Sequence, residues 1–169
     1  MKTQNLESTF DENSKTTKWL DGRWRETDSD QLTTTKYINK AKKLIKRSKI
    51  AVFIYLDPDG MPVGKAMLVA DRVNFTRLYF STNSSSKHVN QVTHNPVATL
   101  YIYDPKTIEG LMLSGKAVIE ADPEWRKRIW RDSYAKFYSG LDDPDYCVLR
   151  FDVDMCNYYH LATNVTFRM

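Results

Sequence analysis

The sequence predicts a mainly β protein: a β-barrel with peripheral helices packed against its outside. Seven short runs have the apolar character of strands, and only short helical stretches separate them. These runs do not follow the strict strand–helix alternation of a parallel sheet, so they favour a closed antiparallel barrel. The chain has 169 residues, which is within the range of one domain with a real core.

The N-terminal part of the chain differs in composition from the rest. Residues 1–33 are polar and rich in Thr, Ser, Asp and Glu, and they contain Trp19 and Trp24. We expect an N-terminal polar arm that docks through these tryptophans, followed by a barrel domain over residues 34–169. In residues 36–49, apolar side chains recur at helical spacing with lysines mostly elsewhere, which predicts an amphipathic helix with a solvated basic face. A nucleic-acid surface is the weaker alternative, because the net charge is only +4 and no recognition motif accompanies it.

The middle of the chain predicts a hairpin, a helix and further strands. Residues 50–56 and 61–70 form the hairpin, because Asp57-Pro58-Asp59-Gly60 between them places Pro and Gly where a type I turn prefers them. A short helix over residues 85–95 ends before Pro96, which disfavours helix in the residue preceding it. Three more strands are expected, over residues 77–82, 97–104 and 110–121.

The C-terminal third predicts one long helix and two strands. Asp122 is expected to cap this helix and Pro123 to occupy its first position. The helix is expected to run through residue 138 with one apolar face, made of Trp125, Ile129, Trp130, Tyr134 and Phe137. The last two strands are expected over residues 146–154 and 156–163.

The stretch FSTNSSSKHVNQV, residues 80–92, joins a strand to the short helix through a polar patch. The patch is typical of a serine N-cap. It is also typical of an anion site, because the unpaired amide groups and the dipole of a helix N-terminus stabilise negative charge there. Its hydroxyl and ammonium groups come from Thr82, Ser84, Ser85, Ser86 and Lys87. Local sequence alone leaves both interpretations open.

Three stretches of the chain resemble one known family. DGMPVGKAM, FSTNSSSKHVNQVTHNPVATLY and WRDSYAKFYSGLDDPDYCVLRF are similar, in this order, to motifs of the pyridoxamine-phosphate-oxidase-like FMN-binding split barrels. The likeness is strongest to the general stress protein 26 branch and runs from about residue 36 to 162. It implies the fold of an FMN-binding split β-barrel.

The resemblance also implies where FMN binds. The phosphate is expected on Thr82, Ser85, Ser86, Lys87 and His88, and Ser81 is expected among the other FMN-binding residues. The strand Lys65, Ala66 and Met67 is expected along the isoalloxazine edge, where the cation at Lys65 tunes the flavin's reduction potential. Trp130 is a weaker candidate, because tryptophans at helical spacing are more often core residues.

Two positions depart from the family pattern. Lys87 stands where the family has Arg, and His88 stands where it has Lys. Lysine keeps the charge but loses the bidentate fork of arginine, and histidine is fully charged only when protonated. We therefore expect FMN affinity to be weaker than usual in this family and to fall as pH rises through the neutral range.

The resemblance implies a homodimer with FMN at its interface and an FMN-dependent oxidoreductase acting on an unidentified small molecule. Two alternatives stay open: a flavin-binding stress or storage protein without turnover, and a split barrel that binds another ligand such as heme. The sequence shows no metal-ligand spacing, secretory signal or apolar run of membrane-spanning length. We expect a cytoplasmic protein without metal, nucleic-acid or membrane partners, with reduced, buried Cys147 and Cys156.

Overall fold

The computed structural model describes residues 15–20, 22–27 and 31–168, and for Trp19, Trp24 and Gln31 it describes the backbone alone. The expected docking of the two tryptophans therefore lies outside what the structure describes, as do residues 1–14. The remainder of the predicted arm forms strands β1 (Lys15–Leu20) and β2 (Arg23–Thr27), and β1 pairs with the C-terminal strand. The boundary between arm and domain stays a prediction.

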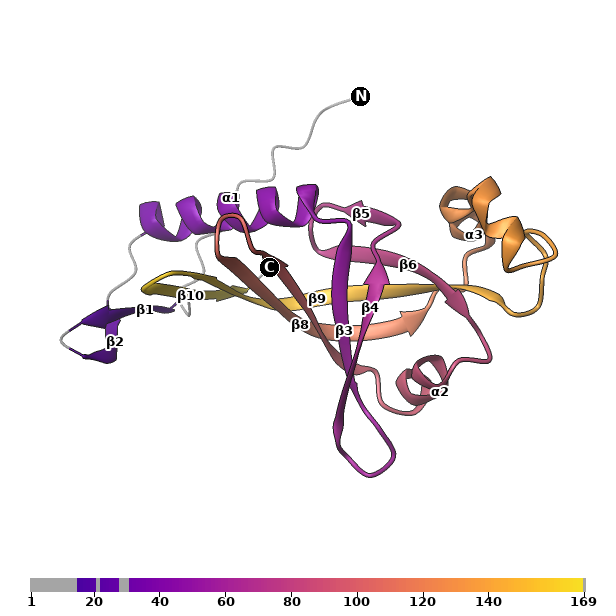
Figure 1. Ribbon diagram of the computed structural model, residues 1–169, viewed down its shortest axis with the longest axis horizontal. Helices are drawn as coiled ribbons and strands as arrows, with labels where there is room; N and C mark the ends of the chain where they lie inside the picture. Colours follow the sequence, from indigo (N-terminus) through magenta and orange to yellow (C-terminus); the bar gives the residue numbers. More distant parts are fainter. Residues whose placement is uncertain (1–14, 21, 28–30, 169) are drawn as a thin grey trace.

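The fold is mainly an antiparallel sheet, as predicted (Figure 1). Its further strands are β3 (Ile50–Leu56), β4 (Pro62–Leu68), β5 (Asp71–Val73), β6 (Arg77–Asn83), β7 (Val97–Asp104), β8 (Glu109–Ile119), β9 (Tyr146–His160) and β10 (Thr163–Arg168). The main path is β2-β1-β10-β9-β8-β7-β3-β4. Strand β6 joins β9 beside it, and β5 pairs with β6.

The barrel is split between β4 and β6. Strand β4 pairs with β3 alone, and β6 pairs with β9 and, at its start, with β5. No ladder of the described residues joins β4 to β6, although the two strands are in contact. Two sheet edges with free backbone groups therefore face one gap, which positions the candidate site described below.

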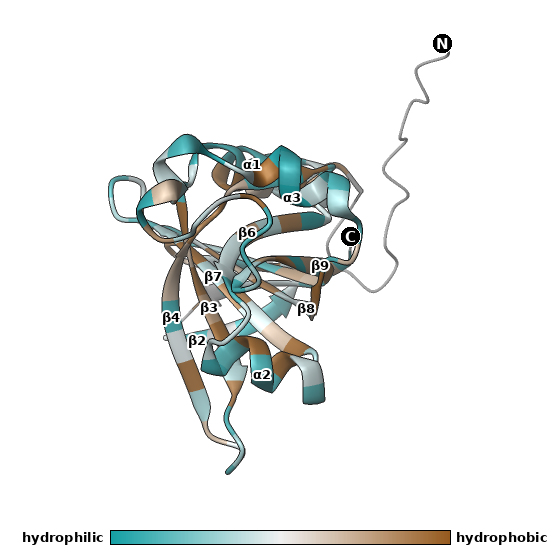
Figure 2. Cartoon of the chain, turned by 90° about the vertical axis from the view of Figure 1, so that its right-hand side faces the viewer, coloured by the Kyte–Doolittle hydropathy of each residue, from teal (hydrophilic) through white to brown (hydrophobic). Residues whose placement is uncertain are grey.

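The α-helices of the described residues lie outside the sheet (Figure 1). Helix α1 (Gln31–Arg47) begins five residues earlier than predicted and buries its apolar side, including Ala41, Leu44 and Ile45, in the main core. Helix α2 (Lys87–His94) lies within the predicted range of residues 85–95 and buries Val89 and Val92. Figure 2 shows α1 and α2 on opposite sides of the strands.

The predicted long helix of residues 122–138 is wrong in its second half. Asp122 caps helix α3 (Pro123–Ile129) by accepting a hydrogen bond from the Glu124 amide, as expected. The backbone then becomes extended at Trp130 and Arg131 before a short 3₁₀ helix, η1 (Asp132–Lys136). The break turns Phe137 away from the buried face, and its side chain is 76% exposed.

The two predicted C-terminal strands are one continuous strand, β9, and β10 follows it. A bulge replaces the expected break, because Ser114 pairs with Met155 while Gly115 pairs with Val153, so Asp154 is the extra residue. A Cβ at Gly115 would overlap the carbonyl oxygen of Asp152, so only glycine fits here without a backbone shift. The polar residues around position 154 thus mark a bulge and not a turn.

Candidate functional site

The gap between β4 and β6 contains a cleft of about 310 Å³. Strand β4 contributes Lys65, Ala66, Met67 and Leu68, and β6 contributes Ser81, Thr82 and Asn83. The opposite wall comes from the segment after α3, through Tyr134, Phe137 and Tyr138. The cleft therefore combines two free strand edges with an aromatic wall.

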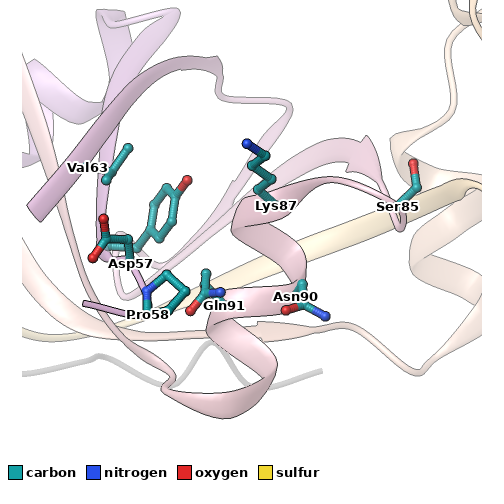
Figure 3. Close-up of a pocket in the computed structure, with 8 residues that line it drawn as sticks. Asp57, Pro58, Val63, Ser85, Lys87, Asn90 and Gln91 are labelled. Carbon is teal, nitrogen blue, oxygen red and sulfur yellow. The ribbon is translucent and has the colours of Figure 1, made fainter. Parts of the chain in front are cut away.

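A second, larger cavity of about 610 Å³ lies between the β3–β4 hairpin and α2 (Figure 3). The hairpin contributes Tyr55, Asp57, Pro58 and Val63, and the loop and helix opposite contribute Ser85, Lys87, Asn90 and Gln91. In Figure 3 the Lys87 side chain extends from the start of α2 toward the hairpin. The N-terminus of α2 stands between the two cavities, because residues on either side of it line one or the other.

Ser86 occupies the N-cap position of α2 but does not cap the helix with its side chain. Its hydroxyl donates instead to the backbone carbonyl of Asn83, 2.7 Å away. The first amide groups of α2 are thus left without a side-chain cap, which is the arrangement that accepts an anion at a helix N-terminus. The interpretation of Ser86 as a side-chain cap is therefore wrong, and the interpretation of this helix start as an anion-binding site stays a prediction.

The hydroxyls of the polar patch are largely engaged within the chain. The Ser84 hydroxyl donates to the Asp145 carboxylate at 3.0 Å, and the Ser85 amide donates to the same carboxylate at 2.7 Å. The Asn83 side-chain amide donates to the second Asp145 oxygen at 2.7 Å. These bonds, that from Asn83 first, lower the pKa of Asp145 to about 2. Sequence reasoning missed Asp145, which ties the loop 83–86 to a segment some 60 residues away.

His88 is buried, with 2% of its surface exposed, and lies near the rings of Phe53 and Tyr55. Its Nε2 lies 2.8 Å from the Thr82 hydroxyl, and its Nδ1 lies 3.5 Å from Lys65 Nζ. Because an ammonium group only donates, Nδ1 is the accepting nitrogen and Nε2 carries the proton. Burial first, and then the charge of Lys65, lower the pKa of His88 to about 4.

The neutral, buried ring of His88 corrects the expectation on pH. A histidine with a pKa near 4 is uncharged across the neutral range, so its deprotonation does not weaken anion binding between pH 6 and 8. His88 is therefore not an exposed helix residue without contacts. His88 contacts the Lys65 and Thr82 side chains and is not among the residues that line either cavity.

Trp130 belongs to a small aromatic core beside the cleft. Its ring packs edge-on against Tyr146, with centroids 5.2 Å apart, and against Tyr134 at 5.9 Å. The Trp130 ring packs against Tyr134 and Tyr138, which line the cleft, but does not line the cleft itself. Sequence reasoning missed the lining residues Tyr134, Phe137 and Tyr138, because the helix ends at Trp130 and this end turns Phe137 to the surface.

The structure brings together some, but not all, of the predicted site residues. Lys65, Ala66, Met67, Ser81 and Thr82 line the cleft, while Ser85 and Lys87 line the neighbouring cavity. Ser86, His88 and Trp130 lie behind these surfaces as supports. Their assignment to a cofactor stays a prediction.

The described part of the chain shows neither a metal cluster nor a membrane-spanning helix. It holds no group of three or more His, Cys, Asp or Glu side chains close enough to share a metal ion. None of its helices combines the length and the apolar character needed to span a membrane. Cys147 and Cys156 are free and buried, as expected.

Comparison with known proteins gives a consistent family. A family model described as pyridoxamine 5'-phosphate oxidase like matches residues 36–168. A solved structure from Clostridium acetobutylicum, of a protein related to general stress protein 26 in the pyridoxinephosphate oxidase family, is 32% identical to this chain. The match covers 79% of this chain and 95% of that one, with a TM-score of 0.71.

Other relatives are more distant and carry different ligands or activities. An FMN-binding protein from Nostoc punctiforme is 15% identical (84% of this chain, 91% of that one, TM-score 0.56), and a heme-binding protein from Mycobacterium smegmatis is 13% identical (76% and 56%, TM-score 0.64). At these identities the likeness shows the fold alone. Dihydrophenazinedicarboxylate synthase from Pseudomonas chlororaphis is 26% identical over 97 residues, 54% of this chain, and the match spans only 43% of that relative.

Proposed function

Since the chain belongs to the pyridoxamine 5'-phosphate oxidase-like family and has its split-barrel fold, we propose that it binds FMN in the cleft between β4 and β6. The observation that carries the proposal is the juxtaposition of this cleft with the uncapped start of α2. FMN consists of a flat ring, a polar chain and a phosphate. The cleft fits the ring, and the helix start beside it fits the phosphate at the end of the chain. The likeness to an FMN-binding protein supports the same choice of ligand.

The residues present fit each part of FMN. Strand edges offer backbone donors and acceptors to the ring, and Met67, Tyr134 and Phe137 offer apolar contact. The α2 amides and the Lys87 ammonium would hold the phosphate. Because Ser84 and Ser86 are bonded within the chain, they order the phosphate loop more than they contact the phosphate.

Lys65 would set the electrostatics at the ring. Its ammonium group, near His88 Nδ1, places positive charge in the cleft, and His88 fixes its position without adding charge of its own. FMN, when bound, supplies hydride or single-electron transfer, and the protein supplies orientation and charge. We therefore propose an FMN-dependent oxidoreductase acting on an unidentified small molecule.

Turnover is favoured over storage by the wall opposite the strands. Phe137 is 76% exposed at the cleft, so an aromatic surface faces solvent beside the proposed ring position. A substrate that stacks there would reach the ring without displacing a core residue. The two buried, free thiols suit a reducing compartment, and we propose a cytoplasmic location.

A heme ligated by histidine fits less well. The three histidines of the chain are His88, His94 and His160, and none is among the described residues that line either cavity. His88 is buried with both ring nitrogens engaged by Thr82 and Lys65. Flavin is therefore the preferred ligand of this site.

We further propose a homodimer. An apolar patch runs across the outer face of four strands, through Leu68 of β4, Ile50 and Val52 of β3, Tyr101 of β7 and Met112 of β8. These side chains are 37–63% exposed. Figure 2 shows the apolar segments along β3 and β4. Monomers rarely expose a contiguous patch of this kind, and a two-fold dimer would place one cleft beside each edge of the interface.

The first test is FMN retention. Purified protein incubated with FMN and desalted should keep the flavin absorption bands, and Lys87→Ala should lower FMN affinity roughly tenfold through loss of one charge-assisted contact. Lys36→Ala on the exposed side of α1 is the matched control and should bind normally. Bleaching of the bands by NADH or NADPH without oxygen would then support turnover. A protein that retains no flavin would refute the proposal.

A further inference from the structure

We propose that His88 is a positioning residue that joins the two edges of the cleft and makes the Lys65 ammonium and the Thr82 hydroxyl a pair of donors for the bound flavin. This inference rests on the proposed function and deepens it. It concerns this chain in particular, because His88 stands where the family pattern has Lys.

The first support is the place of the imidazole ring between two strands. Lys65 belongs to β4 and Thr82 to β6, and both line the cleft. No ladder of the described residues joins these strands. The His88 ring, carried by α2, lies with Nδ1 3.5 Å from Lys65 Nζ and with Nε2 2.8 Å from the Thr82 hydroxyl. One side chain therefore connects two strand edges that the backbone leaves unconnected.

The second support is the direction of the hydrogen bonds, which two neighbours of the ring determine. The Lys65 ammonium can only donate, so Nδ1 accepts. The Ser86 hydroxyl lies 3.3 Å from Nε2 but gives its proton to the Asn83 carbonyl, so it can only accept there. Nε2 therefore carries the ring proton and donates to Thr82. The Thr82 hydroxyl keeps its own proton, which is available to an acceptor in the cleft.

The third support is that the ring is fixed and neutral. It is 2% exposed, and the rings of Phe53 and Tyr55 lie 6.1 and 6.3 Å from it, centroid to centroid. Burial first, and then the charge of Lys65, lower the pKa of His88 to about 4, so Nδ1 stays an acceptor across the neutral range. Lys65 itself is exposed, and a lysine side chain has many rotamers. A fixed acceptor favours the rotamer that places its ammonium at the cleft.

The histidine also determines the charge in the cleft. A lysine at position 88 would place a second ammonium beside Lys65 and repel it, whereas a neutral histidine accepts a hydrogen bond from it. The cleft thus keeps one oriented positive charge. A cation at this place stabilises the reduced, anionic form of a flavin relative to the oxidised form, so its orientation affects the reduction potential.

The hydrogen-bond directions are tested without flavin. Long-range proton–nitrogen NMR correlation on the full chain reports the tautomer of each imidazole, and His88→Gln identifies the His88 signals. We expect the Nε2–H tautomer of His88 at neutral pH and a shifted Nδ1 resonance in Lys65→Met. An Nδ1–H tautomer, or an Nδ1 resonance unchanged by Lys65→Met, overturns the inference.

The link to the flavin is tested by the midpoint potential of the FMN-loaded protein. Lys65→Met should weaken the binding of reduced relative to oxidised FMN about tenfold, which lowers a two-electron potential by about 30 mV. His88→Gln, whose amide stands in for Nε2 but not for Nδ1, should shift this ratio about threefold in the same direction and should add no shift in the Lys65→Met background. His88→Asn, whose amide stands in for Nδ1 alone, should keep the potential and lower FMN affinity. His94→Gln, at an exposed histidine of the same helix, is the matched control and should change neither.

The outcomes separate this inference from the proposed function. A His88→Gln shift that persists in the Lys65→Met background overturns the inference, because His88 would then act on the potential by another route. Equal effects of His88→Gln and His88→Asn also overturn it, because they would report a general loss of packing. If the protein binds no FMN, the proposed function fails, and the NMR measurement still decides whether His88 joins Lys65 and Thr82. That measurement on the unmodified protein also decides the tautomer if a variant folds poorly.

Discussion

At the scale of single residues, Asp145 has the clearest structural role in the candidate site. Its carboxylate accepts hydrogen bonds from the Ser85 amide, the Ser84 hydroxyl and the Asn83 amide, so it fixes the backbone that leads into α2. Without this anchor, the uncapped amides of α2 and Lys87 would lose their common orientation. Asp145 thus acts on an anion indirectly, through the loop.

The lowered pKa of Asp145 sets the direction in which protein stability should change with pH. The folded-state pKa is about 2, below the ordinary value of 3.8, so the carboxylate stabilises the folded state above about pH 4. That contribution is lost as pH falls from about 4 toward 2. Asp145→Asn should lower stability and flavin affinity at neutral pH, and its stability deficit should shrink below pH 4. Urea unfolding across pH checks this, with exposed Asp142→Asn as control. A pH-independent deficit would contradict it.

The same residues show what the sequence could and could not predict. The cluster of hydroxyls before a helix could be identified from the sequence, because serine and threonine at a helix start have few interpretations. Their partners were not, since Asp145 is 60 residues away and its contact depends on the tertiary fold. The burial of His88 was likewise hidden, because an isolated helix gives no indication that Phe53 and Tyr55 pack near its second residue.

At the scale of elements, the sequence predicted the turns and helix caps that depend on a few neighbouring residues. The β3–β4 hairpin and the Asp122 cap were predicted correctly, because turn and cap residues act within a few positions. The continuous strand β9 was not, because the bulge at Asp154 exists only through pairing with β8. The helix break at Trp130 was missed for a similar reason: its aromatic partners lie partly on β9.

The bulge makes a prediction about Gly115. Its replacement by alanine would drive a Cβ into the Asp152 carbonyl, so β8 and β9 would have to shift apart. We expect Gly115→Ala to destabilise the protein by about 3 kcal/mol, at the upper end for overpacking. Gly64→Ala on β4 is the matched control, since its Cβ would meet Val52 at an ordinary 3.4 Å. Thermal and urea unfolding measure both variants, and equal stabilities would show that the bulge tolerates a side chain.

At the scale of the whole molecule, the split barrel leaves two kinds of surface unsatisfied. The free edges of β4 and β6 face the candidate cleft, and the outer side of β4, β3, β7 and β8 carries the apolar patch. Strand β4 takes part in both, because Met67 and Leu68 line the cleft while Leu68, 63% exposed, also belongs to the patch. The proposed assembly and the proposed ligand binding would therefore be coupled through one strand.

The patch predicts that a single charge disrupts assembly. Val52 is central, since it is paired with Ala66 on β4 and Tyr101 on β7. Val52→Asp should shift the protein from dimer to monomer in light scattering after size exclusion, because a two-fold interface would bury two such carboxylates close together. Leu32→Asp on α1, at a side chain 80% exposed outside the patch, should leave the dimer intact. If the unmodified protein is a monomer, the homodimer proposal is refuted. If Val52→Asp stays dimeric, the interface lies elsewhere.

With β4 shared between patch and cleft, a monomeric variant should also bind flavin more weakly than the Leu32→Asp control.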